Sequence, residues 1–281
     1  MWKKIILITT FAITILIGQT ININASGSIA GPGDVAITGF NADGNDNIAF
    51  VLLGDTTANQ VIYFTDNEWN GSSIGSGGAF NSGEGFLAWT APNTPLVAGT
   101  VIEISNASTT PSATEGAVTK SSNFNLSGKN EVLYVYLGSD EQTPTAFLTA
   151  FANDDFSSGT IDGTGLTEGT NAMQFDSVDA DVDVAEYTGS RNNQSTVEDY
   201  LAQIMDTSNW AHQDGSGDQS NDGTSPDVPF NTTSFTKPNA ITFAGMNASS
   251  SPSNTLLITL LVGFSTLLFL GAWLRRRKTD C

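Results

Sequence analysis

Short apolar runs recur along the middle of this chain, and Gly, Asn, Asp or Pro bounds each of them. Runs of this kind between turn residues are typical of all-β sandwiches and barrels. Several runs are apolar on both faces, as strands inside a core are. We therefore expect an all-β sandwich with strands at 34–40, 47–53, 60–65, 85–90, 99–105, 131–137 and 145–151, and a less distinct pair at 172–175 and 182–187.

One segment has a helical pattern instead. In STVEDYLAQIM, residues 195–205, Ser195 and Glu198 have the spacing of a capping box, which satisfies the first backbone amides of a helix. We expect a short amphipathic helix whose apolar stripe packs on the sandwich; a groove for a partner is the alternative. The stripe consists of Val197, Tyr200, Leu201, Ile204 and Met205.

The N-terminus has the organisation of a secretory signal peptide. Lys3 and Lys4 precede an apolar stretch at 5–18, and the small residue Ala25 follows. We expect a signal peptide at 1–26 that is cleaved near Ala25 or Ser26. An uncleaved anchor is the alternative, although the apolar stretch is short for a bilayer.

The C-terminus has the organisation of a membrane anchor. Residues 255–274 carry no charge, and twenty helical residues at about 1.5 Å each cover the roughly 30 Å of bilayer hydrocarbon. Three Arg and one Lys follow at once, so the tail at 275–281 should stay in the cytoplasm. We expect a transmembrane helix at 255–274, a flexible stalk at 237–254, and an extracellular β-sandwich domain at 30–236.

Charge separates the middle of the chain from its ends. Six of the 10 Lys and Arg lie in the terminal segments, whereas Asp280 is the single carboxylate there among 29 Asp and Glu. Four basic residues and 28 carboxylates then give the region between Ser26 and Asn254 a net charge of about −24. This field repels phosphates, so we expect no nucleic-acid partner. It attracts divalent cations.

Cys281 is the only cysteine of the chain and His212 the only histidine. The exported region therefore has no disulfide, no thiol nucleophile and no His-based metal cluster. His212 lies in WAHQDGSGDQSNDG, which we interpret as a loop without an apolar frame. We expect no catalytic role for His212 and no cofactor-binding residues.

Two acidic turns form a candidate metal site. In NADGNDN, oxygen-bearing side chains surround Gly44, and FTDNEWNG places two further acids directly after a predicted strand. If both turns share one rim of the sandwich, their oxygens suit Ca²⁺, which takes six to eight such ligands. A hairpin turn that caps its own backbone is the alternative for the first turn. The candidate ligands are Asn41, Asp43, Asn45, Asp46, Asp66 and Glu68.

The same region contains the residue types of a glycosidase, which needs two acids and stacking aromatics in a cleft. Asp66, Glu68 and Glu84 supply the acids, and Trp69 and Trp89 supply the aromatics. A chain with this many acids contains such combinations of acids and aromatics by chance, so we expect no catalytic residues. A hydrolase acting on polysaccharide or phosphoester is the alternative function, and Trp69, Trp89 and Trp210 as a carbohydrate platform is a further one.

Two resemblances support the exported location. The stretches GDVAITGFNADGNDNIAFVLL, VIYFTDNEWNG, GEGFLAWTAP, AGTVIEIS, LSGKNEVLYVYLG and DYLAQIMDTSNW resemble the lamin-tail, immunoglobulin-like sandwich module of secreted bacterial proteins, over residues 30–210. The last 30 or so residues resemble the PEP-CTERM sorting tail, with SSSPSNT in place of its Pro-Glu-Pro. The resemblances imply a bacterial cell-surface protein that is not itself an enzyme, with polysaccharide or other surface proteins as expected partners.

Overall fold

The computed structural model describes residues 27–176, 178 and 181–236. The predicted signal peptide, stalk, transmembrane helix and basic tail lie outside the described residues. Within the part that is described, no helix combines the length and the apolar character needed to cross a bilayer.

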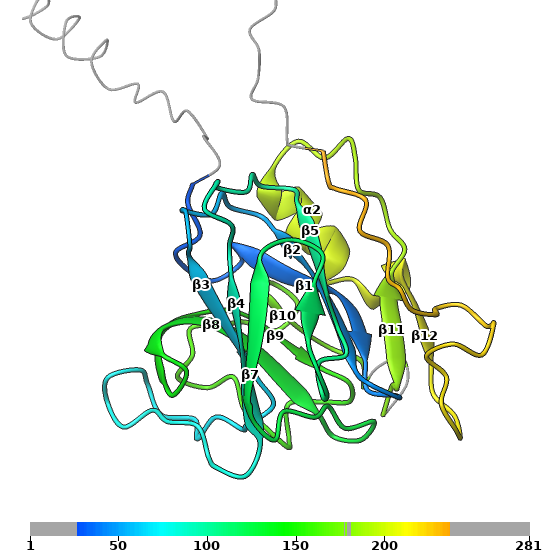
Figure 1. The fold of residues 1–281 in the computed structure, drawn as a ribbon, viewed down its shortest axis with the longest axis horizontal. Coiled ribbons are helices and arrows are strands. Elements are labelled where there is room, and N and C mark those ends of the chain that lie inside the picture. Colours follow the sequence, from blue (N-terminus) through cyan, green and yellow to red (C-terminus); the bar gives the residue numbers. More distant parts are fainter. Residues whose placement is uncertain (1–26, 177, 179–180, 237–281) are drawn as a thin grey trace, which may run out of the picture. The chain divides into compact units, whose positions relative to one another are not determined.

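The described residues form two six-stranded sheets and one α-helix (Figure 1). The first sheet has the order β12-β11-β1-β2-β5-β6, formed by Trp210–Gln213, Val184–Tyr187, Val35–Asn41, Asn47–Leu52, Val101–Ser105 and Ser112–Ala113. The second has the order β10-β9-β8-β3-β4-β7, formed by Ala172–Gln174, Thr143–Ala152, Val132–Asp140, Val61–Thr65, Gly85–Thr90 and Ala117–Ser122. The predicted all-β sandwich with one short helix is confirmed at this level.

All nine predicted strands are present, with ends shifted by a few residues at most. Three strands were not predicted: β6, β7 and β12. The β7 sequence AVTKSS is mostly polar and largely exposed because it pairs with β4 alone at a sheet edge. Strand β12 contains His212, so our interpretation of that segment as a loop without an apolar frame was wrong. His212 pairs with Ala185 of β11 and its ring lies 5.7 Å from that of Phe175.

The main core lies between the two sheets and is rich in aromatic side chains. Phe40 of β1 stacks on Phe151 of β9 at 4.7 Å between ring centroids, and Phe50 of β2 lies 5.1 Å from Phe64 of β3. Trp89 meets the Phe50 ring edge-on at 5.4 Å. These contacts join one sheet to the other, and large buried aromatic side chains supply much of the hydrophobic stabilisation of a domain.

A second aromatic cluster lies on the outer face of the second sheet, beneath the β3–β4 loop. Trp69 of that loop packs edge-on against Phe80 and Phe147, at 5.1 and 5.0 Å between centroids. Trp69, Trp89 and Trp210 are all buried. They are core residues, and the alternative of a carbohydrate platform built on these three is wrong because none offers an exposed ring face.

Helix α2, Val197–Ile204, begins one residue later than the predicted cap implies. The N-cap is Thr196 rather than Ser195: Thr196 Oγ1 accepts a hydrogen bond from the Asp199 amide, and the Asp199 carboxylate accepts one from the Thr196 amide. Both spacings fit a capping box, and the structure uses the second. The predicted apolar stripe is buried on the sandwich, with Val197 partly covered, as expected.

Residues 226–236, which we call the C-terminal strap, cross the outer face of the first sheet. The Phe230 ring packs on Ala49 and Val184, outside the main core. A Cβ at Gly39 would lie 2.6 Å from this ring, so only glycine fits there. The strap therefore covers the sheet and explains why β1 and β2 are buried along both faces.

Arg191 holds the strap in place. Its Nη1 donates hydrogen bonds to the carbonyl oxygens of Asn231 at 2.8 Å and Thr233 at 2.9 Å. Its guanidinium carbon lies 5.2 Å from the centre of the Phe235 ring. Burial lowers the pKa of Arg191 from a value so high that the side chain remains charged at neutral pH.

The described chain begins and ends at the same end of the sandwich, which we call the entry end. The Asp55 amide donates to Gly27 O at 3.0 Å, and the Asp55 carboxylate accepts from the Ala98 amide at 2.7 Å. The neighbouring Gly99 carbonyl accepts from the Phe235 amide at 2.8 Å. The β1–β2 turn lies at the opposite end, roughly 20 Å away along the six residues of β2.

Candidate functional site

The first acidic turn, NADGNDN, connects β1 to β2 as a hairpin. Asn41 Oδ1 accepts a hydrogen bond from the Asp43 amide at 2.9 Å, and the Asp46 amide donates to the Asp43 carbonyl at 3.3 Å. Asp46 has a φ of 54°, in the left-handed region that Asp tolerates better than most residues. The turn caps its own backbone, as the alternative to a metal loop anticipated.

Buried carboxylates gather at this end of the sandwich, which we call the acidic end. Asp46 and Asp66 are each 2% exposed, and Glu131 is 5% exposed. They come from three separate segments: the β1–β2 turn, the residue after β3 and the residue before β8. Because an ionised carboxylate is costly to bury, each needs strong hydrogen bonds or a nearby cation.

The hydrogen bonds come from one short segment, residues 123–130 between β7 and β8, which we call the cap. Three successive cap amides each donate to a different carboxylate at 2.8 Å: Asn125 to Asp66, Leu126 to Asp46, and Ser127 to Glu131. Asp66 also accepts from the Gly85 amide at 2.9 Å.

The cap side chains alternate between the core and the surface. Phe124 is fully buried and Leu126 is 2% exposed, and both belong to the main core. Asn123, Asn125 and Ser127 are exposed. The cap therefore closes the core at the acidic end with two apolar side chains, while its backbone covers the carboxylates.

Desolvation dominates the electrostatics of this cluster. Burial raises the pKa of Asp66 to about 6, that of Asp46 to about 7 and that of Glu131 to about 8, and the amide hydrogen bonds oppose the rise. The charge of Asp66 also raises the pKa of Asp46 and that of Glu131. The positive charge of Lys120 lowers the pKa of Asp46 and Asp66.

Glu84 extends the cluster toward the surface. Burial, together with the smaller effect of the neighbouring charges of Glu68 and Asp66, raises its pKa to about 7. Glu84 Oε2 is buried and has no hydrogen-bond partner. Asp46, Asp66, Glu84 and Glu131 thus lie at one end of the sandwich, and burial raises the pKa of each of them.

The structure brings together some of the six predicted metal ligands and separates others. Asp46 and Asp66 lie close enough for the charge of Asp66 to raise the pKa of Asp46. The Asp43 carboxylate instead accepts a hydrogen bond from the Gln219 amide at 2.8 Å, and the Glu68 carboxylate is hydrogen-bonded to Asn81. Asn41 bonds within its own turn, and the Asn45 side chain is exposed.

Among residues 27–176, 178 and 181–236, no three His, Cys, Asp or Glu side chains are placed to hold one metal ion. Both oxygens of Asp66 and Oδ2 of Asp46 accept backbone amides, and each of these hydrogen bonds takes up one lone pair that a calcium ion could otherwise use. Calcium binding at the acidic end stays a prediction.

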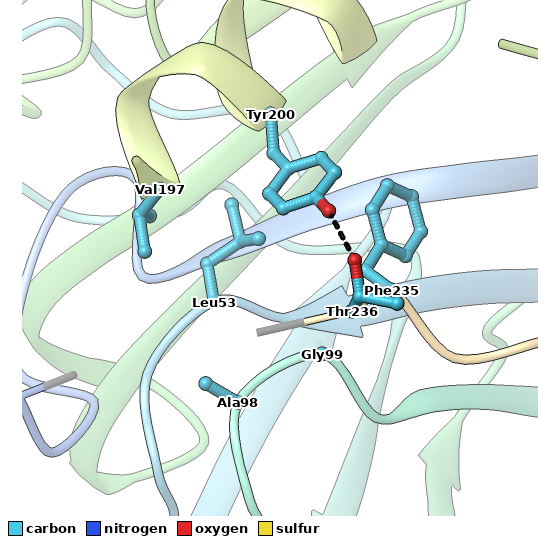
Figure 2. A pocket seen from close by; sticks show the side chains of 7 residues that line it. All are labelled: Leu53, Ala98, Gly99, Val197, Tyr200, Phe235 and Thr236. Atoms are coloured by element: carbon cyan, nitrogen blue, oxygen red, sulfur yellow. Dashed lines mark hydrogen bonds between the residues drawn. The ribbon is translucent and has the colours of Figure 1, made fainter. Parts of the chain in front are cut away.

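A small pocket lies at the entry end beside α2, where the strap ends (Figure 2). The Tyr200 hydroxyl and Thr236 Oγ1 are joined by a hydrogen bond of 2.8 Å, and the Phe235 ring stands beside them. The cavity volume is about 10 Å³, which is room for about one water molecule. Small-molecule sites are typically about 300–1,000 Å³, so this pocket is not a substrate site.

No protein-family model, curated protein or solved structure matches this chain.

Glu131 and the cap are the parts of the site that sequence reasoning missed. Glu131 is the first residue of the predicted strand 131–137, and its position there does not mark it as a buried acid. One available signal was the alternation of Phe124 and Leu126 with polar residues, which indicates that the loop has an inward face.

Proposed function

We propose that this chain is an exported, membrane-anchored cell-surface protein of bacteria, whose β-sandwich domain has a non-catalytic binding or structural role. The apolar segments at 5–18 and 255–274 bracket the domain, and the basic cluster after the second segment favours a cytoplasmic tail. We further propose a lamin-tail-like, immunoglobulin-like sandwich with a PEP-CTERM-like sorting tail, on the resemblances given above. Extracellular polysaccharide or other surface proteins are the proposed partners.

The non-catalytic role rests on the burial and hydrogen bonding of the residues that a hydrolase would use. Asp66 is nearly fully buried and both its oxygens accept backbone amides. Trp69 and Trp89 are buried, so they line no open cleft with it. Asp66 thus supports the fold at the acidic end, and the two Trp side chains belong to the hydrophobic clusters, which favours a structural use of all three over the hydrolase alternative.

Calcium belongs to the proposal as a stabiliser of the acidic end. Above neutral pH the four carboxylates there carry negative charges that repel one another, and a divalent cation would relieve that repulsion. Thermal melting of residues 27–236 at pH 8 in millimolar Ca²⁺ should then give a higher Tm than in EDTA. Asp66→Asn should reduce this difference, whereas Asp155→Asn, at a partly exposed acid outside the cluster, should preserve it. Equal Tm values in Ca²⁺ and EDTA would exclude the stabilising role.

The location can be tested with the single native cysteine as an internal control. The exposed loop residue Ser216 is changed to Cys in a Cys281→Ser background, and intact cells are treated with a membrane-impermeant maleimide. We expect the cysteine at 216 to be labelled on intact cells, and Cys281 of the unmodified chain to be labelled only after lysis. Labelling of Cys281 on intact cells, or of residue 216 only after lysis, would contradict the proposed topology.

A further inference from the structure

One row of residues across the first sheet receives the start of the C-terminal strap. The row consists of Glu186, Gly39, Ala49 and Glu103, from β11, β1, β2 and β5. The Phe230 ring lies over the two small residues in the middle of the row. The two carboxylates at its ends accept the next backbone amides: Glu103 accepts from Phe230 at 3.3 Å, and Glu186 accepts from Asn231 at 2.5 Å.

From this row the strap runs along the strands to the entry end. The Phe235 amide donates to the Gly99 carbonyl at 2.8 Å, and the Gly99 amide donates to the carbonyl of Leu52, the last residue of β2, at 2.6 Å. Phe230 lies at the level of Ala49 and Phe235 at the level of Leu52, which are about 10 Å apart along β2. The strap is therefore roughly parallel to the strands and leaves the sandwich at the entry end.

The strap is also attached in its middle and at its end. Arg191 donates to the carbonyls of Asn231 and Thr233 at 2.8 and 2.9 Å. The Thr236 amide donates to the Arg191 carbonyl at 2.8 Å. The Tyr200 hydroxyl and Thr236 Oγ1 share a hydrogen bond of 2.8 Å (Figure 2). The contacts are thus spread along the whole strap.

The strand that precedes the strap runs in the opposite direction. Gln213 at the end of β12 pairs with Val184, and Val184 pairs with Asn41 beside the β1–β2 turn. Strand β12 therefore ends at the acidic end, and the loop 214–225 leads from there to the strap. In the described part of the chain β12 is a four-residue edge strand that pairs with β11 alone. A pull on its acidic end would open these pairs one after another.

From this geometry we propose that the strap is a load-bearing connection, which carries the tension between the membrane anchor and a partner bound to the sandwich. This function rests on the proposed membrane anchor. A tethered body under tension turns until its attachment point and its loaded point lie on the line of force. With the attachment after Thr236 and the load beyond the entry end, the force then acts along the strap.

The direction of the force decides how the contacts of the strap break. A pull along the strap slides it against the sheet, so the contacts along its length resist together. Strand β12 carries none of the load while the strap stays in place. Forced unfolding is governed by the rate of crossing the unfolding barrier, and contacts that must break together give a higher barrier than contacts that open in sequence.

Single-molecule pulling on the full chain in detergent micelles tests this proposal. Cys281 is replaced by Ser, and pairs of introduced cysteines carry the handles. Asn45→Cys, at the exposed β1–β2 turn, is common to both pairs. The second cysteine is Lys237→Cys, directly after the strap, or Ser216→Cys, in the exposed loop before it. The pair with 237 loads the strap, and the pair with 216 bypasses it.

We expect the rupture force through residue 237 to exceed that through residue 216 by about twofold at the same loading rate. The domain should then unfold without an earlier step. Release of the strap on its own would lengthen the chain by up to about 80 Å, from residues 214–236. Such a step at a force below the rupture force through residue 216, or a rupture force through 237 no higher than through 216, would overturn the proposal.

Variants of the strap contacts make the test specific. Arg191→Met and Phe230→Ala should lower the rupture force through residue 237 and change that through residue 216 little. Lys129→Met, at a solvent-exposed ion pair, should leave both forces unchanged. Equal reductions in both geometries would refute the role of the strap contacts, and the unsubstituted comparison decides where a variant fails to fold. The measurement does not depend on cellular location, so its failure is distinct from failure of the proposed topology, which the maleimide labelling tests.

Discussion

Arg191 provides the sharpest test of how the C-terminal strap is held, through the substitution Arg191→Met. Methionine preserves much of the apolar length and removes the charge and all the donors. The two hydrogen bonds from Nη1 to strap carbonyls, at 2.8 and 2.9 Å, are each worth about 1.5–3 kcal/mol because the donor is charged. The contact with the Phe235 ring adds roughly 0.5–1 kcal/mol.

Removing a buried guanidinium also removes its desolvation cost, which offsets part of this loss. We therefore expect Arg191→Met to lower the free energy of unfolding by about 3 kcal/mol, and the Tm by roughly 6–12 °C for a domain of this size. Arg191→Lys should show an intermediate loss, since an ammonium retains the charge and loses the planar stacking on Phe235. Urea unfolding of residues 27–236, followed by tryptophan fluorescence, measures these differences.

The matched control is Lys129→Met, because Lys129 forms a solvent-exposed ion pair with Asp181. This substitution should change the free energy of unfolding by less than about 1 kcal/mol. If Arg191→Met produced a change as small as Lys129→Met does, the strap would not depend on Arg191 and our account of its attachment would be wrong.

Three further substitutions test separate parts of the fold by the same urea unfolding. Thr196→Ala should lower the free energy of unfolding by about 1 kcal/mol and Ser195→Ala by less than about 0.5 kcal/mol, because Thr196 is the N-cap. A larger loss for Ser195→Ala than for Thr196→Ala would show that the predicted residue, Ser195, is the N-cap instead. Gly85→Ala should lower the free energy of unfolding by about 1–3 kcal/mol, since its Cβ would lie 2.0 Å from the cap backbone. Gly31→Ala should be nearly neutral because a Cβ there meets open space. Equal effects of the two substitutions would contradict the contact between Gly85 and the cap. Phe230→Ala should cost about 3 kcal/mol, and a cost below about 1 kcal/mol would show that the strap ring contributes little.

The fold class and most strands were accessible from sequence because apolar runs between turn residues carry that information locally. Strand β7 could not be predicted from the sequence, since an exposed edge strand such as AVTKSS needs no apolar alternation. The strap could not be predicted from the sequence for a different reason. Its anchors, Phe230 and Phe235, fit against residues far away in sequence, and no local period marks them.

The arrangement of the acidic end could be predicted only in part from the sequence. Sequence reasoning placed Asp46 and Asp66 at one rim, and the structure brings them close. It did not foresee that backbone amides of a third segment would satisfy them, because amide groups are present at every position and carry no sequence signature. The helix cap was misplaced by one residue because Ser195 and Thr196 both fit the same rule.

The neighbouring positions of Gly27 and Phe235 have a consequence for engineering. Both backbones lie within a few hydrogen bonds of Asp55 and Gly99, so a short peptide could join the two ends of the domain. New termini could then be opened elsewhere to give a circular permutant, or the intact sandwich could be inserted into a surface loop of a host protein. In the inserted arrangement the host would meet the sandwich at a single edge, and the remainder would project freely as a self-contained module.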